Sequence, residues 1–362
     1  MAPRISGSSL ADAPPGQAAR RRMAVVVLNH RTAEDTYLAV SSLIASDRPP
    51  DHVIVVDNDV ADECRAHFSP PLQRFPVVRS VRLQADRERP AEAGHYVQQE
   101  SALAARTESP VPSPQLTYLH TGRNLGFSGG MNVGARAALE AGADMVLLAN
   151  SDIVVSPHCL ERLESTLSSH AGAGIAGPLV LSRTRPDRVA SAGISYNRRS
   201  GRMRVLGVGT KAIEASPESR NVDAVSGCLM LVTRKVLDTI GFLDERYFFG
   251  FEDLDFCRRA EAAGFSTILV NSAVAYHEGG RSIGRASARR WYFGARNHLL
   301  LASHREAGEG RGARALRLSW VAALNLAHAL TADAGSLPAR LAATTRGVRD
   351  YLSGCYGPDS AA

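Results

Sequence analysis

The chain has 362 residues, of which 44% are hydrophobic and 22% are charged, and its formal net charge is +6. This composition excludes a disordered or fibrous protein, and the length suits one large domain with an appendage, or two domains. The five cysteines include no C-x-x-C pair, which argues against a metal cage or a disulfide framework and favours a reducing compartment.

The N-terminal region has a composition of its own. Residues 1–22 are rich in Ala, Pro, Gly and Ser and end in three arginines, which predicts a flexible tail. The apolar run that follows, 23–28, is too short for the core of a signal peptide. No stretch approaches the ~20 apolar residues of a membrane-spanning helix. We therefore expect a cytoplasmic protein.

Two apolar runs separated by a helical pattern open the ordered part of the chain. Residues 24–28 (AVVVL) and 53–56 (VIVV) are predicted strands, and 36–45 is a predicted helix that Pro49 and Pro50 break. Continuous apolar strands of this kind are typical of a parallel sheet covered by helices on both faces. The predicted fold class is therefore α/β, with a mostly parallel central sheet.

The middle of the chain begins with an irregular stretch. Residues 82–115 carry Arg, Glu, Gln and a Ser/Pro run, which predicts an inserted surface loop. After it we expect a strand at 116–119, a glycine-rich turn at 122–130, a helix at 131–140, a strand at 145–149, and a helix capped by Ser156 with Pro157 at its first position.

The last part of the chain turns from mixed elements to helices. Thr233 is predicted to cap a short helix that stops at Gly241, and a longer helix ends at Gly264. A strand over 266–270 and a further extended piece come next. Beyond Arg285 the pattern is helical, so we divide the chain into a tail, a domain over 23–283 and a helical appendage over 284–362.

The positive charge is almost entirely arginine and is concentrated near the C-terminus. Eleven arginines between Arg285 and Arg349 face only three acidic residues there. Most of them suit a solvated helical surface, and the alternative is an anionic partner such as a pyrophosphate or an acidic membrane surface. The chain has no zinc-finger spacing, no RNA-binding aromatic motif and no basic zipper, so we expect no nucleic-acid partner.

Polar clusters follow three of the predicted strands. They are Asn29-His30-Arg31, Asp57-Asn58 and Asn150-Ser151-Asp152. In open α/β sheets ligands bind beyond the carboxyl ends of the strands, so three such clusters predict one shared site.

The glycine-rich segment from Thr121 to Asn132 opens a helix. Glycines let backbone amides approach a ligand, and a helix N-terminus favours phosphate, although a tight strand-to-helix turn is the alternative. The segment lacks the Gly-Lys-Ser/Thr of a P-loop and the G-x-G-x-x-G of a dinucleotide site. Arg123, Asn124 and Asn132 favour a ligand-binding loop.

Two further groups of residues predict catalytic chemistry. Asp152 stands where a diphosphate-bound Mg²⁺ or Mn²⁺ would need a carboxylate, and His277 offers a second ligand. Glu252 and Asp253 begin a helix just after the aromatic run 247–251, which suits a sugar acceptor. Burial beside a second carboxylate raises the pKa of an acid and makes it a candidate general base.

The order of these motifs resembles that of family-two glycosyltransferases with the GT-A fold, and within them the rhamnosyltransferase-like group. The similar segments span 23–282, with a further one from Trp291. They read VVVLNHR, VVDND, GRNLGFSGGMNVG, LLANSD, VSGCLMLVTR, GFLDERYFFGFEDLDFCRRAEAAGF, AYHEGGRS and WYFGARNHLLLA.

The resemblance implies a metal-dependent, inverting transfer of a sugar from a nucleotide-sugar donor to an acceptor hydroxyl, with dTDP-L-rhamnose or a related deoxysugar, or else a UDP-sugar, as donor. Asn150-Ser151-Asp152 then occupies the place of the family's Asp-x-Asp motif. The implied residues are Asp253 and Glu252 for catalysis; Asp152 and His277 for Mg²⁺ or Mn²⁺; Leu28, Asn29, Arg31, Asp57, Asn58, Arg123, Asn124, Gly126, Gly129, Asn132, Asn150, Ser151 and Arg281 for the donor; and Gly227, Phe249 and Phe251 for the acceptor or sugar.

The chain departs from the family's pattern in two places. The 82–115 insertion is longer than expected, and Asp59 stands where the group often has a small residue. Two alternatives stay open: a non-catalytic nucleotide-sugar-binding protein, which would usually have lost one of the acidic residues, and a sugar nucleotidyltransferase, which would carry a basic glycine-rich loop after the first strand.

The acceptor is not indicated by any motif. A glycan, a lipid-linked saccharide and a secondary metabolite all fit. As a separate possibility, the chain could form a homo-oligomer. The mainly apolar stretch from Leu316 to Leu330, with Trp320, is favoured as core packing, and its alternative is a helix lying on a membrane surface.

Overall fold

A computed structural model describes residues 20–62, 64–65, 78–82, 114–214, 218–279, 287–306 and 308–359. Most of the predicted tail, most of the predicted insertion and Arg281 lie outside these residues. The strands are β1 (Met23–Asn29), β2 (His52–Asp57), β3 (Val78–Arg82), β4 (Gln115–His120), β5 (Met145–Asn150), β6 (Ile153–Val155), β7 (Ala173–Ser182), β8 (Val189–Ser191), β9 (Ile194–Tyr196), β10 (Met203–Val205), β11 (Arg220–Asn221), β12 (Leu229–Thr233) and β13 (Ser266–His277). The helices are α1 (Ala33–Ile44), α3 (Gly126–Glu140), α4 (Cys159–Ser169), α5 (Arg234–Ile240), α6 (Glu252–Ala262), α7 (Ala288–Ala302), α8 (Arg311–Thr331) and α9 (Leu337–Leu352), with 3₁₀ turns η1 (Ala212–Glu214) and η2 (Glu245–Tyr247).

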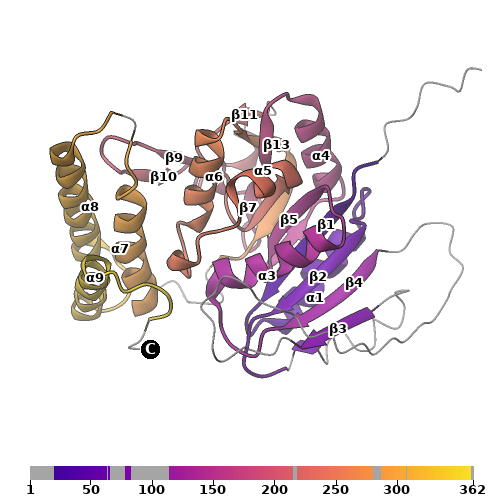
Figure 1. The fold of residues 1–362 in the computed structure, drawn as a ribbon, viewed down its shortest axis with the longest axis horizontal. Helices are drawn as coiled ribbons and strands as arrows, with labels where there is room; N and C mark the ends of the chain where they lie inside the picture. The colour runs from indigo at the N-terminus through magenta and orange to yellow at the C-terminus, as the bar shows by residue number, and fades with distance from the viewer. Residues whose placement is uncertain are drawn as a thin grey trace, which may run out of the picture.

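One large sheet organises the molecule (Figure 1). Its strand order is β11-β13-β7-β12-β5-β1-β2-β4-β3, and the block from β5 to β3 is entirely parallel. Strand β12 lies antiparallel to both β5 and β7, which are its neighbours. The predicted α/β class with a mostly parallel central sheet is confirmed.

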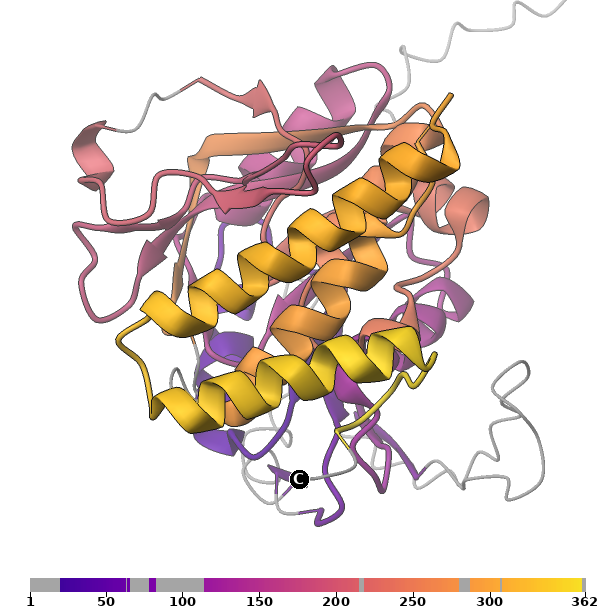
Figure 2. The ribbon, with the colours of Figure 1, turned by 90° about the vertical axis from the view of Figure 1, so that its left-hand side faces the viewer.

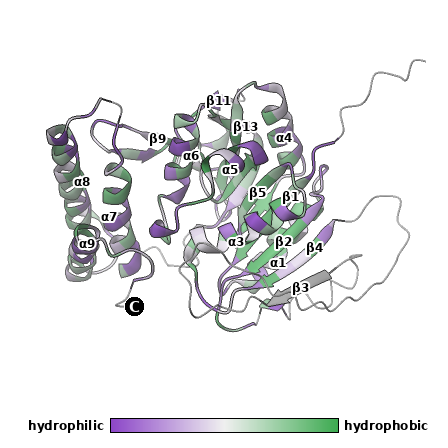
Figure 3. Cartoon of the chain, viewed as in Figure 1, coloured by the Kyte–Doolittle hydropathy of each residue, from purple (hydrophilic) through white to green (hydrophobic). Residues whose placement is uncertain are grey.

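Helices cover both faces of the sheet because the strands are apolar on both sides. In β1 the side chains of Val25 and Val27 enter one core, which α1 and α4 close, whereas Val26 and Leu28 enter a second core beneath α3, α5 and α6. Each buried valine or leucine contributes about 1.5–3 kcal/mol. Figure 3 shows this composition as continuous hydrophobic colouring along the central strands.

Several element boundaries differ from the predicted ones. Helix α1 begins at Ala33, three residues before the predicted start. Helix α3 begins at Gly126, inside the predicted glycine-rich turn. Helix α4 begins at Cys159 with His158 as its N-cap, so the prediction that Ser156 caps it is wrong. The extended pieces before His277 are one strand, β13, whose register with β7 shifts between Val270 and Val274.

The C-terminal helices α7, α8 and α9 form a layer of their own beside the sheet domain, nearest the viewer in Figure 2. Helix α7 begins where the Ser287 hydroxyl accepts a hydrogen bond from the Arg289 backbone N–H at 3.2 Å. Helix α9 passes close to α7 at Gly347, where a Cβ would lie 2.4 Å from the Tyr292 carbonyl oxygen. None of the described helices is long and apolar enough to cross a membrane.

Candidate functional site

The register of the sheet brings the predicted polar clusters to one edge. Asn29 lies opposite Asp57 on the neighbouring strand, and Leu28 lies opposite Asn150 on the other side. The hydroxyls of Ser151 and Thr32 are 2.7 Å apart, which connects the ends of β5 and β1 directly. The three clusters therefore line one end of the parallel block, where α/β folds bind ligands.

A buried network forms the floor of this edge. The Asp57 carboxylate is 0% exposed and accepts hydrogen bonds from the Asn29 amide at 2.7 Å and the Tyr118 hydroxyl at 2.6 Å. Burial raises the pKa of Asp57, although these two hydrogen bonds oppose the rise. The Asn29 amide oxygen in turn accepts a hydrogen bond from the Thr36 hydroxyl at 2.9 Å. Asp57 and Asn29 thus hold the strand ends together from below.

Asn58 holds the loop that precedes α3. Its side-chain oxygen accepts from the Leu125 backbone N–H at 2.9 Å, and its side-chain amide donates to the Gly126 carbonyl at 2.9 Å and to the Asn124 side-chain oxygen at 3.2 Å. That oxygen of Asn124 also accepts from the Gly126 N–H at 2.8 Å. The polar atoms of Asn58 are therefore used in shaping the loop that is predicted to bind the ligand.

The glycines of α3 allow close packing. Gly126 has a φ of +75°, and a Cβ there would lie 2.5 Å from the Phe248 carbonyl oxygen. A Cβ on Gly129 would lie 2.9 Å from the Leu125 Cβ, and one on Gly130 would lie 2.4 Å from Leu28 Cδ1. Glycine is needed at these positions because α3 packs closely against Leu28 of the sheet and against the backbone at Phe248.

Asn132 belongs to the fold rather than to an open site. It is buried, and its amide exchanges two hydrogen bonds with the backbone of Leu243, at 2.9 and 3.0 Å. Its amide also donates to the Glu245 carboxylate at 3.0 Å. Because these contacts use its polar atoms, we leave Asn132 and the packing glycine Gly129 out of the site that we propose below.

Two arginines of the predicted donor site lie at the surface. Arg123 is exposed and forms no ion pair with any residue that the structure describes. Arg31 has a φ of 59° and approaches Asp59 at 3.4 Å, an exposed contact that adds little to stability. Both guanidinium groups are therefore available to an anionic ligand.

Asp152 and His277 meet above the end of β5. The His277 Nε2 lies 3.0 Å from Asp152 Oδ1 and 3.3 Å from the Asn150 side-chain nitrogen. Burial by itself would raise the pKa of Asp152, but the hydrogen bond and charge of His277 and the backbone amides of Asp152 and Gly279 outweigh it, so that pKa is lowered. The Asn150 side-chain oxygen is buried without a hydrogen-bond partner. A carboxylate, an imidazole and an orphaned amide oxygen at one place fit Mn²⁺ or Mg²⁺.

Asp253 and Glu252 are the first residues of α6, where the helix dipole favours carboxylates. The Asp253 carboxylate accepts from the Gly227 N–H at 2.9 Å and the Leu254 N–H at 2.8 Å. Glu252 Oε2 is buried and unpaired. Burial first, and then the charge of Asp253, raise the pKa of Glu252 to about 8. Burial also raises the pKa of Asp253, against the two backbone hydrogen bonds.

The turn just before β12 connects the two acidic groups. The Gly227 N–H donates to Asp253, and the carbonyl of the next residue, Cys228, accepts from the Asn150 backbone N–H at 2.9 Å. A Cβ on Gly227 would lie 3.1 Å from the Asp253 Cβ, so glycine permits this approach. The sheet edge with Asp152 and the start of α6 with Asp253 are thus two sides of one site.

The turn that leads into α6 is strained. Phe248 has a φ of 60° and Phe251 a φ of 75°, a region that non-glycine residues seldom occupy. The Phe248 carbonyl accepts from the Phe127 N–H at 2.6 Å, which joins the turn to the start of α3. Strain of this kind persists only where the surroundings hold it, and it gathers at functional sites.

Two side chains of helix α7, Arg296 and Asn297, fix the strained turn, and both are 0% exposed. The Asn297 amide nitrogen lies 2.7 to 2.9 Å from the carbonyl oxygens of Tyr247, Phe249 and Gly250. The Arg296 guanidinium donates to the carbonyls of Arg246 at 3.1 Å and Tyr247 at 3.0 Å. We call this pair the α7 clamp. Both residues lie in the segment WYFGARNHLLLA, for which the resemblance implied no role, although two polar residues within an apolar helical run were a signal of buried hydrogen bonding.

The predicted acceptor aromatics also contact α7. The Phe251 ring stacks on His298 at 5.2 Å between centroids, and the Phe249 ring meets Phe293 edge-on at 6.3 Å. Both rings are partly buried, so they join the start of α6 to the appendage.

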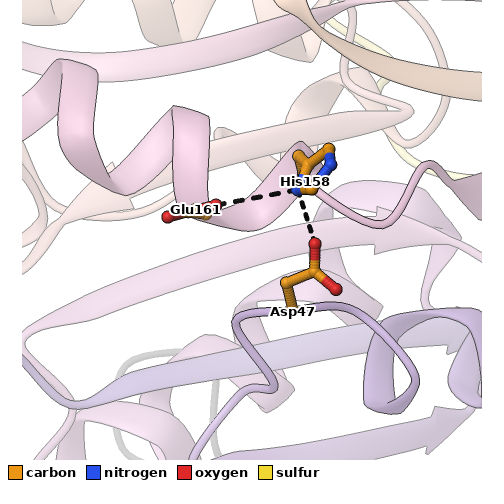
Figure 4. A group of neighbouring side chains, drawn as sticks. All are labelled: Asp47, His158 and Glu161. Carbon is orange, nitrogen blue, oxygen red and sulfur yellow. Dashed lines mark ion pairs between the residues drawn. The ribbon is translucent and has the colours of Figure 1, made fainter.

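Two more groups of metal-ligating side chains occur among the described residues. Figure 4 shows His158 between Asp47 and Glu161, with ion pairs of 2.5 and 3.8 Å. All three are exposed, and they tie the α1–β2 loop to α4 as an ordinary surface contact. The second group places Asp57, Asp62 and His120 within 4.8 Å of one another, and both ring nitrogens of the buried His120 lack a hydrogen-bond partner.

Comparison with known proteins adds relatives in sequence and in fold. The sequence profile of the glycosyltransferase-like family 2 matches residues 93–294, which is more than half of the chain. Two curated proteins from strains of Mycobacterium tuberculosis, both called N-acetylglucosaminyl-diphospho-decaprenol L-rhamnosyltransferase, are 39% identical over 72 residues. That segment is 20% of this chain and spans 24% of the relatives' length.

Among solved structures, a mannosyltransferase from Pyrobaculum calidifontis, in complex with GDP-Man and Mn²⁺, superposes with a TM-score of 0.50. The match covers 95% of this chain and 86% of that one, at 15% sequence identity, and it supports the predicted GT-A fold. Because the profile matches more than half of the chain, the assignment follows: the chain belongs to the glycosyltransferase-like family 2.

Proposed function

We propose that the protein is a metal-dependent, inverting glycosyltransferase that moves a sugar from a nucleotide-sugar donor to an acceptor hydroxyl. The observation that carries the proposal is the Asp253 carboxylate, held at the start of α6 by the N–H groups of Gly227 and Leu254. It lies beside the buried Glu252 and across the 227–228 turn from Asn150. A fixed carboxylate next to a donor site suits a general base.

Asp253 is the better base of the acidic pair. The raised pKa of Glu252 keeps that residue protonated near neutral pH, so it places no second negative charge beside Asp253. Asp253 is half-buried as a residue, whereas Glu252 is buried. In the proposed reaction Asp253 takes the proton of the acceptor hydroxyl, whose oxygen attacks the anomeric carbon as the bond to the nucleoside diphosphate breaks. A single displacement of this kind inverts the anomeric centre.

The residues that would hold the metal are Asp152 and His277, with the orphaned side-chain oxygen of Asn150 close to them. Bound there, Mn²⁺ or Mg²⁺ would supply Lewis-acid stabilisation of the leaving diphosphate. The lowered pKa of Asp152 keeps its carboxylate ionised and ready to coordinate. Arg123 is exposed and forms no ion pair with a described residue, so it is available to bind the diphosphate of the donor. Arg281, outside the described residues, is proposed for the diphosphate on the family resemblance alone.

The donor's base and sugar are proposed from more distant arguments. At the ends of β1 and β2 the buried Asn29 and Asp57 are hydrogen-bonded to each other, so we propose that they shape the bottom of the nucleobase pocket, with the unpaired ring of His120 at the end of β4 beside them. The relatives named as L-rhamnosyltransferases support dTDP-L-rhamnose or a related deoxysugar, and a UDP-sugar is the second candidate. The acceptor is a hydroxyl of a glycan, a lipid-linked saccharide or a secondary metabolite.

The proposed organisation is a GT-A domain over 23–283 with a helical appendage over 284–362. The five cysteines are all free, which supports the cytoplasmic location that we propose. Two other functions use the same fold: non-catalytic binding of a nucleotide sugar, and nucleotidyl transfer. Non-catalytic binding would give no role to the arrangements around Asp253 and Asp152. Nucleotidyl transfer would require a basic glycine-rich loop after β1, and the sequence has none there.

Donor turnover and binding test the proposal. Purified protein is assayed with a panel of dTDP-, UDP- and GDP-sugars, with and without Mn²⁺ or Mg²⁺, and with mixed glycan and lipid-linked acceptors. We expect metal-dependent turnover of one donor, its loss in Asp253→Asn with binding retained, and no loss in the control Asp238→Asn, which changes an exposed residue of α5. Folded protein that binds none of the nucleotide sugars would refute the proposal.

A further inference from the structure

The outer face of α8 is apolar and has no packing partner among the residues that the structure describes. Leu316 is 73% exposed, Trp320 52% and Leu330 52%, and the exposed Ala323 and Ala327 lie between them. Their spacing of three and four residues places all five on one side of the helix. The opposite side packs inward through Arg317, Val321 and Ala329. The preference for core packing in this stretch was therefore wrong for half of the helix, and the remaining half faces solvent.

Charge is missing from this face and gathered at its ends. Between Leu318 and Ala332 the chain has no Asp, Glu, Lys or Arg. Arg305 and Arg311 are exposed at the N-terminal end of α8. Arg289 and Arg290 are exposed in the first turn of α7, next to Trp291, whose ring lies 5.0 Å from that of His328 near the other end of α8.

These four arginines have no acidic partners among the described residues. Residues 287–359 contain ten arginines and no lysine against five acidic residues. Four of those acids already pair with other arginines: Glu306 with Arg258, Glu309 with Arg317, Asp350 with Arg349 and Asp359 with Arg346. The fifth, the exposed Asp333, follows the C-terminal end of α8, so the four arginines leave a net positive charge at the border of the apolar face. The natural complement of such a face is an apolar layer beneath a negatively charged surface.

We propose that this face, with α8 lying in the plane of the interface, docks onto an anionic lipid bilayer. Helix α8 is about 30 Å long, so it can lie along the surface with Trp320 and the leucines below the headgroups. The arginines then reach the lipid phosphates at both ends. The docked surface extends to α9, which packs against α8 and exposes Leu337 and Leu352 at its two ends.

Docking would also narrow the choice of acceptor, a consequence that rests on the proposed function. Helix α7 lies between the docked helices and the turn that holds Asp253, with Asn297 bonded to that turn. A saccharide carried by a lipid would be brought to this side of the molecule. The membrane docking itself does not depend on the reaction, and its test uses no sugar substrate, so either can fail alone.

Tryptophan fluorescence tests the face directly, because the chain has only Trp291 and Trp320. In full-length Trp291→Phe, Trp320 reports alone; in the matched control Trp320→Phe, the ring packed on His328 reports alone. With vesicles of equal parts phosphatidylcholine and phosphatidylglycerol we expect a blue shift in Trp291→Phe and none in Trp320→Phe. No shift in either protein would overturn the proposal. A shift that follows protein concentration without vesicles would assign the face to a second copy of the chain and overturn it as well.

Co-sedimentation with the same vesicles measures how much the apolar side chains and the arginines each contribute to membrane binding. Leu316→Ser combined with Trp320→Ser changes only exposed positions, so the protein should fold as judged by circular dichroism, and we expect about tenfold weaker binding or more. Arg305→Ala and Arg311→Ala should each weaken binding about fivefold, and added salt should do the same. Arg185→Ala, an exposed arginine on the loop after β7, should have no effect. Wild-type binding by the Leu316/Trp320 variant would overturn the proposal.

Discussion

Replacing Asn297 by Ala tests whether the α7 clamp fixes the conformation of the turn over 247–251, which leads to Asp253. The Asn297 amide is the shared donor for the carbonyls of Tyr247, Phe249 and Gly250, and the turn runs directly into Glu252 and Asp253. The hydrogen bonds of Asn297 go to this turn and to Arg296, and none of them reaches Asp152 or His277. We therefore expect Asn297→Ala to act through the position of Asp253.

The size of the effect follows from strain and hydrogen bonding. Phe248 and Phe251 both have positive φ, which costs of the order of 1–3 kcal/mol each. An amide has two hydrogens, so Asn297 makes two full hydrogen bonds at a time, each contributing about 1 kcal/mol. Losing them removes about 2 kcal/mol from a turn that holds a similar amount of strain. Because 1.4 kcal/mol corresponds to tenfold, we expect kcat to fall about tenfold to hundredfold.

The assay separates chemistry from binding and from stability. Steady-state turnover at saturating donor gives kcat, calorimetric titration gives the Kd of the nucleoside diphosphate, and thermal melting gives Tm. Asn271→Ala is the matched control, since Asn271 is also buried and its amide donates to one carbonyl, that of Glu218, at 2.9 Å. Both variants should melt at lower temperature. Only Asn297→Ala should lose kcat, and its loss of nucleotide affinity should be smaller than its loss of kcat.

Two results would refute this reasoning. Wild-type kcat in Asn297→Ala would mean that the turn keeps its shape without the clamp. Equal losses of kcat and nucleotide affinity would mean that the clamp supports the donor site as a whole, through the Phe248 carbonyl and the start of α3, rather than Asp253 in particular.

Three more predictions concern the proposed site itself. Asp253→Asn should lower turnover by at least about a hundredfold while nucleotide titration still shows binding; substantial residual turnover would exclude Asp253 as the base. The folded-state pKa of Glu252 is raised above its ordinary value, so wild type loses stability as pH rises through that range to about 8. Glu252→Gln should lack this loss, and urea unfolding that gave parallel pH profiles for both proteins would contradict it. His277→Ala should weaken Mn²⁺ binding in the presence of nucleoside diphosphate about tenfold or more, measured by electron paramagnetic resonance; unchanged affinity would remove His277 from the metal site.

Much of the sheet domain could be predicted from local pattern. Continuous apolar runs such as 24–28 and 53–56 identify buried parallel strands, and the rule that ligands bind at strand ends is enough to group Asn29, Asp57 and Asn150 in one site. What the pattern cannot supply is strand order. The antiparallel β12 between β5 and β7 depends on pairing between segments far apart in the chain, and no local signal reports it.

The start of α3 shows where tertiary packing overrides propensity. A run with Gly126, Gly129 and Gly130 predicts a turn, since glycine destabilises a helix interior by about 1 kcal/mol relative to alanine. In the structure it is helical, because only a residue without a Cβ leaves room for Leu28 and the Phe248 carbonyl. The glycines therefore indicated close approach correctly, but the approaching partner is the protein's own chain.

The α7 clamp and the outer face of α8 could not be predicted from the sequence for a different reason. Their polar and apolar residues are visible in the chain, but their partners are not. Asn297 bonds carbonyls of an irregular turn about 50 residues earlier, and such acceptors carry no side-chain signature. Helix α8 has apolar residues on both of its faces, and the sequence does not show which face is buried. Only the fold distinguishes the buried Val321 from the exposed Trp320.

The turn over 247–251 is the point at which these separate parts meet. On one side the Phe248 carbonyl accepts from Phe127 at the start of α3, and on the other the α7 clamp binds the neighbouring carbonyls. The turn ends at Asp253 through the left-handed Phe251. A shift of α7 must therefore either break the hydrogen bonds between the α7 clamp and the turn or displace the Asp253 carboxylate. Because Phe248 and Phe251 have strained φ values, the turn has few other conformations to adopt. Helix α7 thus links the position of the proposed base to the helices that carry the exposed apolar face. If the proposed docking presents an acceptor from that face, α7 would set the geometry in which the acceptor meets Asp253.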